Sequence, residues 1–157
     1  MKYRQIANNE IEKNEYHRMR YALWSHHTEK ELWDEMEYIL KGKNFYKNEL
    51  SWTAFVVVRD DGKLGGFIEM TLYPELNFCD SKPVGYIEGW YVDKDLRRKG
   101  TGKNLVKIAE NWLRANNCLE IASDVELHNK VSQQAHTALG FNQSHIKDNC
   151  IFYKKSI

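Results

Sequence analysis

A short glycine motif in the middle of the chain has the residue types needed to bind an anion. Its pattern is Arg97-x-x-Gly100-x-Gly102, with Arg98 and Lys99 adding positive charge, and it lies between a β-rich run and a helical pattern. Unpaired N–H groups and the positive end of a helix dipole at such a place can bind a pyrophosphate. The motif predicts a site for a phosphorylated cofactor, although it also fits an ordinary helix start with solvated charges.

The spacing of this motif excludes two common phosphate-binding loops. A Walker A loop needs G-x-x-x-x-G-K-[ST], and a dinucleotide-binding fingerprint needs a third glycine; both features are missing here. Nucleotide hydrolysis and hydride transfer therefore lose support.

Two carboxylates have the chemistry to bind and deprotonate an amine. Glu88 lies inside the apolar run Val84–Val92, and Asp124 ends the run 119–124. A primary amine with a pKa of about 10.4 is mostly protonated at neutral pH, so a proton must leave before the nitrogen attacks. A buried Glu88 needs a cation as partner, which a cationic ligand would supply. Glu88 as part of a structural ion pair and Asp124 as a turn or capping residue are the alternatives.

The periodicity places these residues on an alternating set of strands and helices. Thr28 to Glu31 fits a capping box before an amphipathic helix, with Gly42 as its stop, and 60–63 is turn chemistry for a hairpin. The later strands alternate with helices, so the class is mixed α/β with a mostly antiparallel sheet. The expected strands are 2–6, 52–59, 64–72, 84–92, 119–124 and a pair after Phe141; the expected helices are 11–24, 29–41, one after Gly102, and 130–139 with Gly140 as C-cap.

Composition limits the remaining choices. A chain of 157 residues with 42% hydrophobic content closes one core, so we expect a single domain over 1–157. A net charge of +1 gives no field that favours nucleic acid or an acidic membrane surface. The first ten residues lack a signal-peptide pattern, and Cys79, Cys118 and Cys150 show no C-x-x-C spacing. We expect a soluble cytoplasmic protein with reduced thiols and no metal site.

The glycine motif resembles the pyrophosphate loop of the GNAT superfamily of N-acetyltransferases, R/Q-x-x-G-x-G/A between a long strand and a helix. The resemblance continues downstream in Asn129-x-x-Ser132-x-x-Ala135-His136-x-x-x-Gly140-Phe141. It implies the GNAT fold, an α+β sheet of six to seven mostly antiparallel strands flanked by about four helices. It also implies acetyl-CoA as co-substrate, no metal, and direct attack of the amine in a ternary complex.

Three further segments are similar to one branch of the aminoglycoside 6'-N-acetyltransferases. They are Leu23-Trp24-Ser25, Pro83 to Gly89, and Ala122-Ser123-Asp124. The resemblance implies a small cationic aminoglycoside as substrate, with Asp124 as first choice of base. It implies that Glu88, Asp124, Trp24 and His27 line the substrate site, and that the cofactor is held by Trp90, Tyr91, Val92, Arg97, Arg98, Lys99, Gly100, Thr101, Gly102, Lys103 and Asn129. Members of this branch are often dimers, so a homodimer is expected.

The chain departs from the family pattern at three positions. His136 stands where a tyrosine usually protonates the departing thiolate, so either its imidazolium takes over that role or no side-chain acid is used. Glu75 stands where an aromatic residue is common, and His145 where an acidic one is; both are assigned to the substrate site. Acetylation of polyamines or protein amines, or a non-catalytic acyl-CoA-binding module, remain as alternatives.

Overall fold

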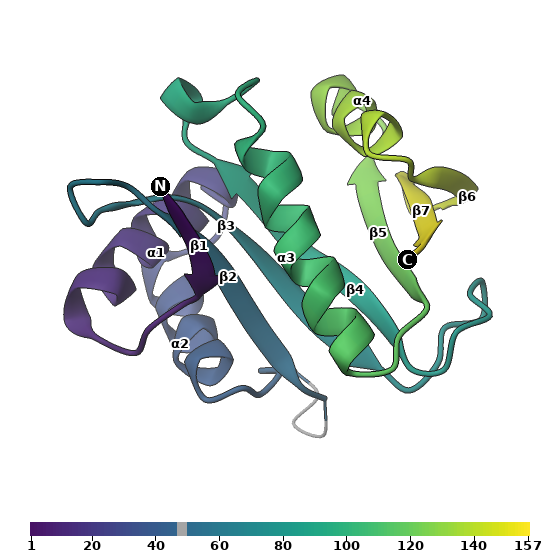
Figure 1. Cartoon of the computed structure of the whole chain (residues 1–157), viewed down its shortest axis with the longest axis horizontal. Helices are drawn as coiled ribbons and strands as arrows, with labels where there is room; N and C mark the ends of the chain where they lie inside the picture. The colour runs from purple at the N-terminus through teal and green to yellow at the C-terminus, as the bar shows by residue number, and fades with distance from the viewer. Residues whose placement is uncertain (47–49) are drawn as a thin grey trace. The chain divides into compact units, whose positions relative to one another are not determined.

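The computed structural model describes residues 1–46 and 50–157, and within them it has seven strands, four α-helices and one 3₁₀ turn. Helices and strands alternate late in the chain, as the sequence predicts. The elements are β1 (Lys2–Gln5), α1 (Glu10–Leu23), α2 (Glu29–Leu40), β2 (Trp52–Val58), β3 (Leu64–Tyr73), β4 (Val84–Val92), the 3₁₀ turn η1 (Lys94–Leu96), α3 (Thr101–Ala115), β5 (Glu120–Glu126), α4 (Lys130–Ala138), β6 (Asn142–Lys147) and β7 (Cys150–Ser156) (Figure 1).

The strands form one mixed sheet in the order β1-β2-β3-β4-β5-β7-β6. The pairs β1–β2, β2–β3, β5–β7 and β6–β7 are antiparallel, whereas β4 and β5 are parallel. A parallel pair needs a long crossover connection, which α3 provides. The prediction of a mixed, mostly antiparallel sheet with about four helices is confirmed.

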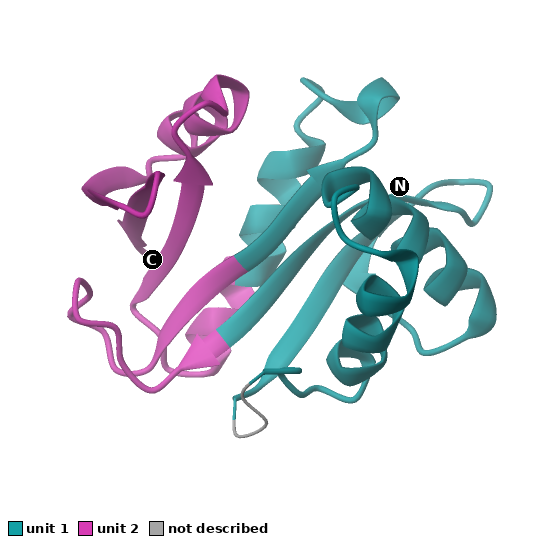
Figure 2. Cartoon of the chain, turned by 180° about the vertical axis from the view of Figure 1, so that it is seen from behind, with its two compact units in different colours: residues 1–71, 88–109 teal, residues 72–87, 110–157 magenta. Residues whose placement is uncertain are grey.

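The chain divides into two compact units (Figure 2). Unit 1 comprises residues 1–71 and 88–109, and unit 2 comprises residues 72–87 and 110–157. The glycine motif belongs to unit 1 and Asp124 to unit 2.

The helices of unit 1 begin where their capping residues predict. Asn9 caps α1 by accepting a hydrogen bond from the N–H of Glu12, and Thr28 and Glu31 form the predicted capping box of α2. Helix α2 ends at Leu40, and Gly42 follows with a positive φ of 76°. Figures 1 and 2 show α1 and α2 on one face of the unit 1 strands and the first part of α3 on the other.

Apolar side chains from both of these helices and from β2 and β3 fill the core of unit 1. Tyr16 packs edge-on against Phe67, with 5.1 Å between ring centroids. Trp24 and Tyr91, two of the predicted site residues, are half-buried and pack against this core. The core therefore helps to hold them in place. The fully buried members are Tyr16, Met19, Met36, Ile39, Trp52, Ala54, Val56, Leu64 and Phe67.

Unit 2 builds a second, smaller core around β5. Val84, Cys79 and Ala122 are buried there, and Tyr86 packs against them. Helix α4 ends at its C-cap residue Leu139, and the glycine after it takes a φ of 88°. The sequence prediction named Gly140 itself as C-cap; it lies one residue beyond, where a left-handed conformation commonly ends a helix.

Candidate active site

The loop that carries the glycine motif is anchored on β3. Leu96 of η1 packs over Gly65, where an added Cβ would come within 2.4 Å of the leucine Cδ1. Arg59 donates hydrogen bonds of 2.7 and 2.8 Å to the carboxylate of Asp95 and one of 3.0 Å to Asp93. These contacts hold the chain in place between the end of β4 and the start of α3.

The glycine motif has the backbone geometry expected of an anion-binding turn. Gly100 has a φ of 83°, and a Cβ added there would meet no atom within 4 Å among the described residues. Asn104 donates its N–H to the Gly100 carbonyl, so the N–H groups of the preceding residues of α3 have no acceptor inside the helix. The hydroxyl of Thr101 is buried and has no hydrogen-bond partner among the described residues. This helix start fits a phosphorylated ligand.

Arg97 is bound back to β4. Its Nε donates a 2.8 Å hydrogen bond to the carbonyl of Val92, and its guanidinium lies 5.7 Å from the centre of the Tyr91 ring. The cations Arg98, Lys99 and Lys103 are exposed. Arg97 therefore shapes the turn, whereas the other three cations supply mobile positive charge around it.

The C-terminal end of β4 contacts the start of α3 closely. A Cβ on Gly102 would lie 2.9 Å from Cζ2 of Trp90. In unit 2, Gly85 of the same strand meets Leu113 of the same helix, at 2.3 Å from an added Cβ.

The predicted acceptor residues of unit 1 gather beside Gly89. A Cβ on Gly89 would come within 2.5 Å of Cη2 of Trp24, so the indole contacts the β4 backbone at the residue after Glu88. His27 is exposed and donates its N–H to the Trp24 carbonyl, which ties the two residues into one turn. Glu88 itself is half-buried. The structure thus places Trp24, His27 and Glu88 in unit 1.

The predicted acceptor residues of unit 2 lie along one row of the sheet. The hydroxyl of Tyr86 donates a short hydrogen bond to Oδ2 of Asp124. Asp124 lies opposite Phe152 on β7, and Phe152 lies opposite His145 on β6. The His145 ring stacks on Phe152 with 4.7 Å between centroids. Directly opposite residues share one face of a sheet, so Asp124 and His145 are on the same face.

Glu75 lies apart from this row. Its carboxylate forms a 2.9 Å ion pair with Lys82, and both side chains are about two-thirds exposed. Hydrogen bonding to Lys82 lowers the pKa of Glu75. Asn129 is the N-cap of α4, and its side chain accepts a 3.1 Å hydrogen bond from the N–H of Ser132.

His136 is the most buried of the predicted site residues in unit 2, with 2% of its surface exposed. Nδ1 lies 2.8 Å from the Ser132 carbonyl, which can only accept, so Nδ1 carries the proton in this contact. Nε2 lies 2.8 Å from the Ser123 hydroxyl, and when the ring is neutral it accepts a hydrogen bond from that hydroxyl. Burial lowers the pKa of His136, although the Ser132 carbonyl and the Asp124 charge act in the opposite direction. The geometry favours a neutral ring.

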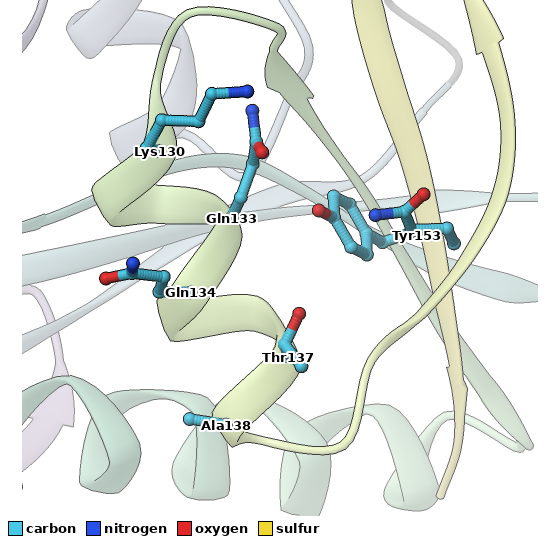
Figure 3. A pocket seen from close by; sticks show the side chains of 7 residues that line it. Lys130, Gln133, Gln134, Thr137, Ala138 and Tyr153 are labelled. Carbon is cyan, nitrogen blue, oxygen red and sulfur yellow. The ribbon is translucent and has the colours of Figure 1, made fainter.

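A pocket of about 460 Å³ in unit 2 lies between α4 and the strands β6 and β7 (Figure 3). None of the predicted site residues lines it, so its position gives no support to the predicted chemistry. In the described residues there is also no cluster of three or more side chains suited to a metal ion, and no helix long and apolar enough to cross a membrane. The pocket is lined by Lys130, Gln133, Gln134, Thr137, Ala138, Gln143 and Tyr153.

The three thiols of the chain are free. Cys79 and Cys118 are buried and Cys150 is partly exposed. Burial raises the pKa of Cys79 to about 11 and raises the pKa values of the other two thiols as well.

Two site contacts were missed by sequence reasoning. Tyr86 holds Asp124, and Ser123 holds His136. Both partners lie within the motif segments. Ser123 directly precedes Asp124, and Tyr86 lies two residues before Glu88. A signal for the first was available: if β4 and β5 pair in parallel, Tyr86 comes opposite Ala122, two residues from Asp124.

Known acetyltransferases are similar to this chain in sequence. The family model described as "Acetyltransferase (GNAT) family" matches residues 13–141. An aminoglycoside N(6')-acetyltransferase type 1 from Klebsiella aerogenes is 39% identical over 125 residues, covering 80% of each chain. The enzyme of the same name from Serratia marcescens is 33% identical over 140 residues, covering 88% of this chain and 89% of that one.

Solved structures agree with the sequence relatives. The structure of AAC(6')-Iy in complex with the bisubstrate analogue CoA-S-monomethyl-acetylneamine has a TM-score of 0.80 and 28% identity, covering 93% of each chain.

Proposed function

The chain belongs to the acetyltransferase (GNAT) family, and from this premise we propose that it transfers the acetyl group of acetyl-CoA to the 6'-amino group of aminoglycosides. The observation that carries the proposal is the 39% identity to an aminoglycoside N(6')-acetyltransferase over 80% of both chains. Transfer takes place in a ternary complex by direct attack of the amine, without an acyl-enzyme. The buried thiols, with raised pKa values, are poor nucleophiles and agree with this route.

The start of α3 would hold the pyrophosphate of acetyl-CoA. Its backbone N–H groups and the buried Thr101 hydroxyl need acceptors, and phosphate oxygens provide them. Arg98, Lys99 and Lys103 would neutralise the phosphate charge, and Arg97 would keep the turn in shape. Acetyl-CoA supplies an activated thioester. The remaining proposed contacts come from Gly100, Gly102, Asn129 and the β4 residues Trp90, Tyr91 and Val92.

The end of β4 would bind the thioester arm through its backbone. A backbone N–H in this stretch would donate to the thioester carbonyl oxygen as negative charge develops on it.

The acceptor would be held by carboxylates and an aromatic wall. Glu88 and Asp124 attract the polycation, Trp24 packs against an apolar face of a sugar ring, and His27 lies at the edge of that wall. His145 and Glu75 are assigned more peripheral contacts with the same substrate. Convergence of these residues on one substrate is part of the proposal.

Asp124 would accept the ammonium proton, directly or through water. A hydrogen bond from Tyr86 fixes the orientation of this carboxylate and leaves its other oxygen for the substrate. A carboxylate with an ordinary pKa of about 4 is a modest base, so positioning contributes the larger part of the rate. The catalytic role predicted for His136 remains a prediction, and it requires the charged ring that burial disfavours.

The proposal also covers the domain organisation, cellular location, oligomeric state and partners of the protein. We propose a single domain over 1–157 that works in the cytoplasm as a homodimer, with neither nucleic acid nor membrane as partner. The near-zero net charge supports the last point.

Release of CoA thiol at steady state tests the proposed function. Purified protein is given acetyl-CoA with aminoglycosides that carry an amino or a hydroxyl group at the 6' position, and with spermidine and a lysine peptide. Turnover confined to the 6'-amino compounds is expected. Turnover only with spermidine or the peptide would favour a different acceptor, and acetyl-CoA binding without any turnover would favour a non-catalytic module.

A further inference from the structure

We propose that a buried ion pair between Arg20 and Glu69 positions the indole of Trp24 and thereby sets the affinity for the acceptor. The inference rests on the proposed function, in which Trp24 walls the acceptor side of β4. Neither Arg20 nor Glu69 touches the substrate in this scheme, so both are positioning residues.

Arg20 is held at three points by other elements of unit 1. Its Nε donates to Oε1 of Glu69 on β3 at 2.6 Å. Its two terminal nitrogens donate to the Leu32 carbonyl at 2.6 Å and to Oε2 of Glu35 at 2.9 Å, both on α2. The side chain is 1% exposed. A planar guanidinium bound at three points cannot rotate, so its plane is fixed by the fold.

This fixed plane lies over the ring of Trp24. The guanidinium carbon is 5.0 Å from the indole centre, which is the distance of a cation–π contact. Trp24 is the half-buried C-cap residue of α1, and its backbone N–H donates to the Arg20 carbonyl. The indole also packs beside Phe67 and Gly89, and Arg20 adds a fixed cation over its ring.

Glu69, on β3, contacts Arg20 and also lies close to the place where Trp24 meets Gly89. Its side chain is fully buried; Oε1 accepts hydrogen bonds from the Tyr16 hydroxyl at 2.5 Å and from Arg20. Oε2 has no hydrogen-bond partner among the described residues. It lies 3.3 Å from the Cβ position of Gly89, and Cη2 of Trp24 lies 2.5 Å from that position. The carboxylate and the indole thus share the contact surface of one glycine.

Stability alone does not account for this arrangement. A buried carboxylate oxygen without a donor is unfavourable, and well-packed apolar residues of the same volume often stabilise a protein as much as a buried ion pair does. What charged groups add is fixed geometry. Burial works to lower the pKa of Arg20, but the Glu69 charge raises it above its usual value, so the guanidinium stays charged over the working pH range.

The positioning of Trp24 can be read without any enzyme activity. The indole N–H signal of Trp24 is assigned in a ¹⁵N NMR spectrum by its loss in Trp24→Phe, and is then followed in Arg20→Lys. Lysine keeps the charge but not the planar fork, so we expect this signal to shift or broaden. Arg4→Lys is the control, because Arg4 likewise pairs with a buried glutamate, donating two hydrogen bonds to Glu12 between β1 and α1.

Kinetics then show whether that position matters for the acceptor. Arg20→Lys is expected to raise KM for a 6'-amino aminoglycoside about tenfold, within the range of a lost cation–π contact, with kcat and KM for acetyl-CoA nearly unchanged. In the Trp24→Ala background the same substitution should have almost no further effect, because its target is gone. If Arg20→Lys fails to fold, Glu69→Gln, which keeps the shape and loses the charge, replaces it in both experiments.

Each outcome has a distinct meaning. An unchanged Trp24 signal in the folded variant, or effects on KM that simply add in the double variant, would overturn the positioning role. A shifted signal in a protein that acetylates no aminoglycoside would leave the positioning of Trp24 intact and remove the proposed function instead. A shifted signal with unaltered acceptor KM would show that the position of the indole does not set affinity.

Discussion

The hydroxyl of Tyr86 donates a hydrogen bond to the carboxylate of Asp124 across the parallel β4–β5 pair. The tyrosine therefore occupies one carboxylate oxygen and orients the other. In the proposed reaction that second oxygen receives the proton of the substrate ammonium group.

Removing either partner should reduce acceptor turnover to different extents. Asp124→Asn removes the base and is expected to lower kcat/KM for an aminoglycoside by about 10²- to 10⁴-fold. Tyr86→Phe keeps the carboxylate but removes the hydrogen bond that orients it, so we expect kcat/KM to fall about tenfold. Steady-state kinetics measure both, with Tyr21→Phe on the exposed face of α1 as control. Equal activity of Tyr86→Phe and the unmodified protein would argue against an orienting role.

The turn at Gly100 offers a matched pair of glycine substitutions. Gly100 and Gly62 have φ values of 83° and 85°, and neither has an atom within 4 Å of a Cβ among the described residues. Alanine at either position should destabilise the protein by about 1 kcal/mol through backbone strain alone. Only Gly100→Ala should also raise KM for acetyl-CoA, because Gly62 lies in the β2–β3 turn. A similar KM in both variants would remove the anion-binding role of the turn.

Gly89→Ala should weaken acceptor binding without altering the cofactor site. The new Cβ would lie 2.5 Å from Trp24, so the indole must move. Gly85→Ala creates a comparable overlap with Leu113 in unit 2 and serves as control. Thermal unfolding should show a loss of about 1–3 kcal/mol for both variants. A higher acceptor KM is expected for Gly89→Ala alone, and its presence in both would point to a general loss of structure.

His136 predicts a definite pH dependence of stability. Its pKa in the folded protein lies below the ordinary value of 6.5, so the unfolded chain binds a proton first as the pH falls. The stabilisation is fully present above pH 6.5 and is lost as the pH drops from there toward the folded pKa. Urea unfolding at a series of pH values should show this loss, and His136→Gln should flatten it.

The same histidine tests the acid role. If a protonated His136 protonated the thiolate, kcat would rise as the pH is lowered through its pKa, and His136→Gln would abolish that rise. We expect no such rise between pH 7.5 and 6.

Local sequence patterns were sufficient for most of the fold. The capping box at Thr28 and the hairpin turn at Gly62 depend only on neighbouring residues, so they can be predicted from the sequence. Both are present in the structure. The strand and helix bounds differ from the predicted ones by one or two residues at most places, as expected for frayed ends.

Contacts between distant segments could not be foreseen in the same way. The sequence gives no sign of the Glu69 cluster, because its partners Tyr16 and Arg20 lie about fifty positions away. Sequence patterns place His136 on a helix, and only the packing of Phe141 and Tyr153 against its ring shows that it is buried. Burial and pairing depend on the whole fold, whereas periodicity reports only one element at a time.

The burial of two of the three thiols has a practical consequence for measuring this reaction. Thiolates, not thiols, react with disulfide reagents, and the buried Cys79, with a pKa of about 11, holds almost none at neutral pH. A colorimetric disulfide dye can therefore report released CoA continuously, with only a slow background from the partly exposed Cys150. Counting the dye-reactive groups before and after unfolding would turn the same reagent into a simple gauge of how much of a variant is native.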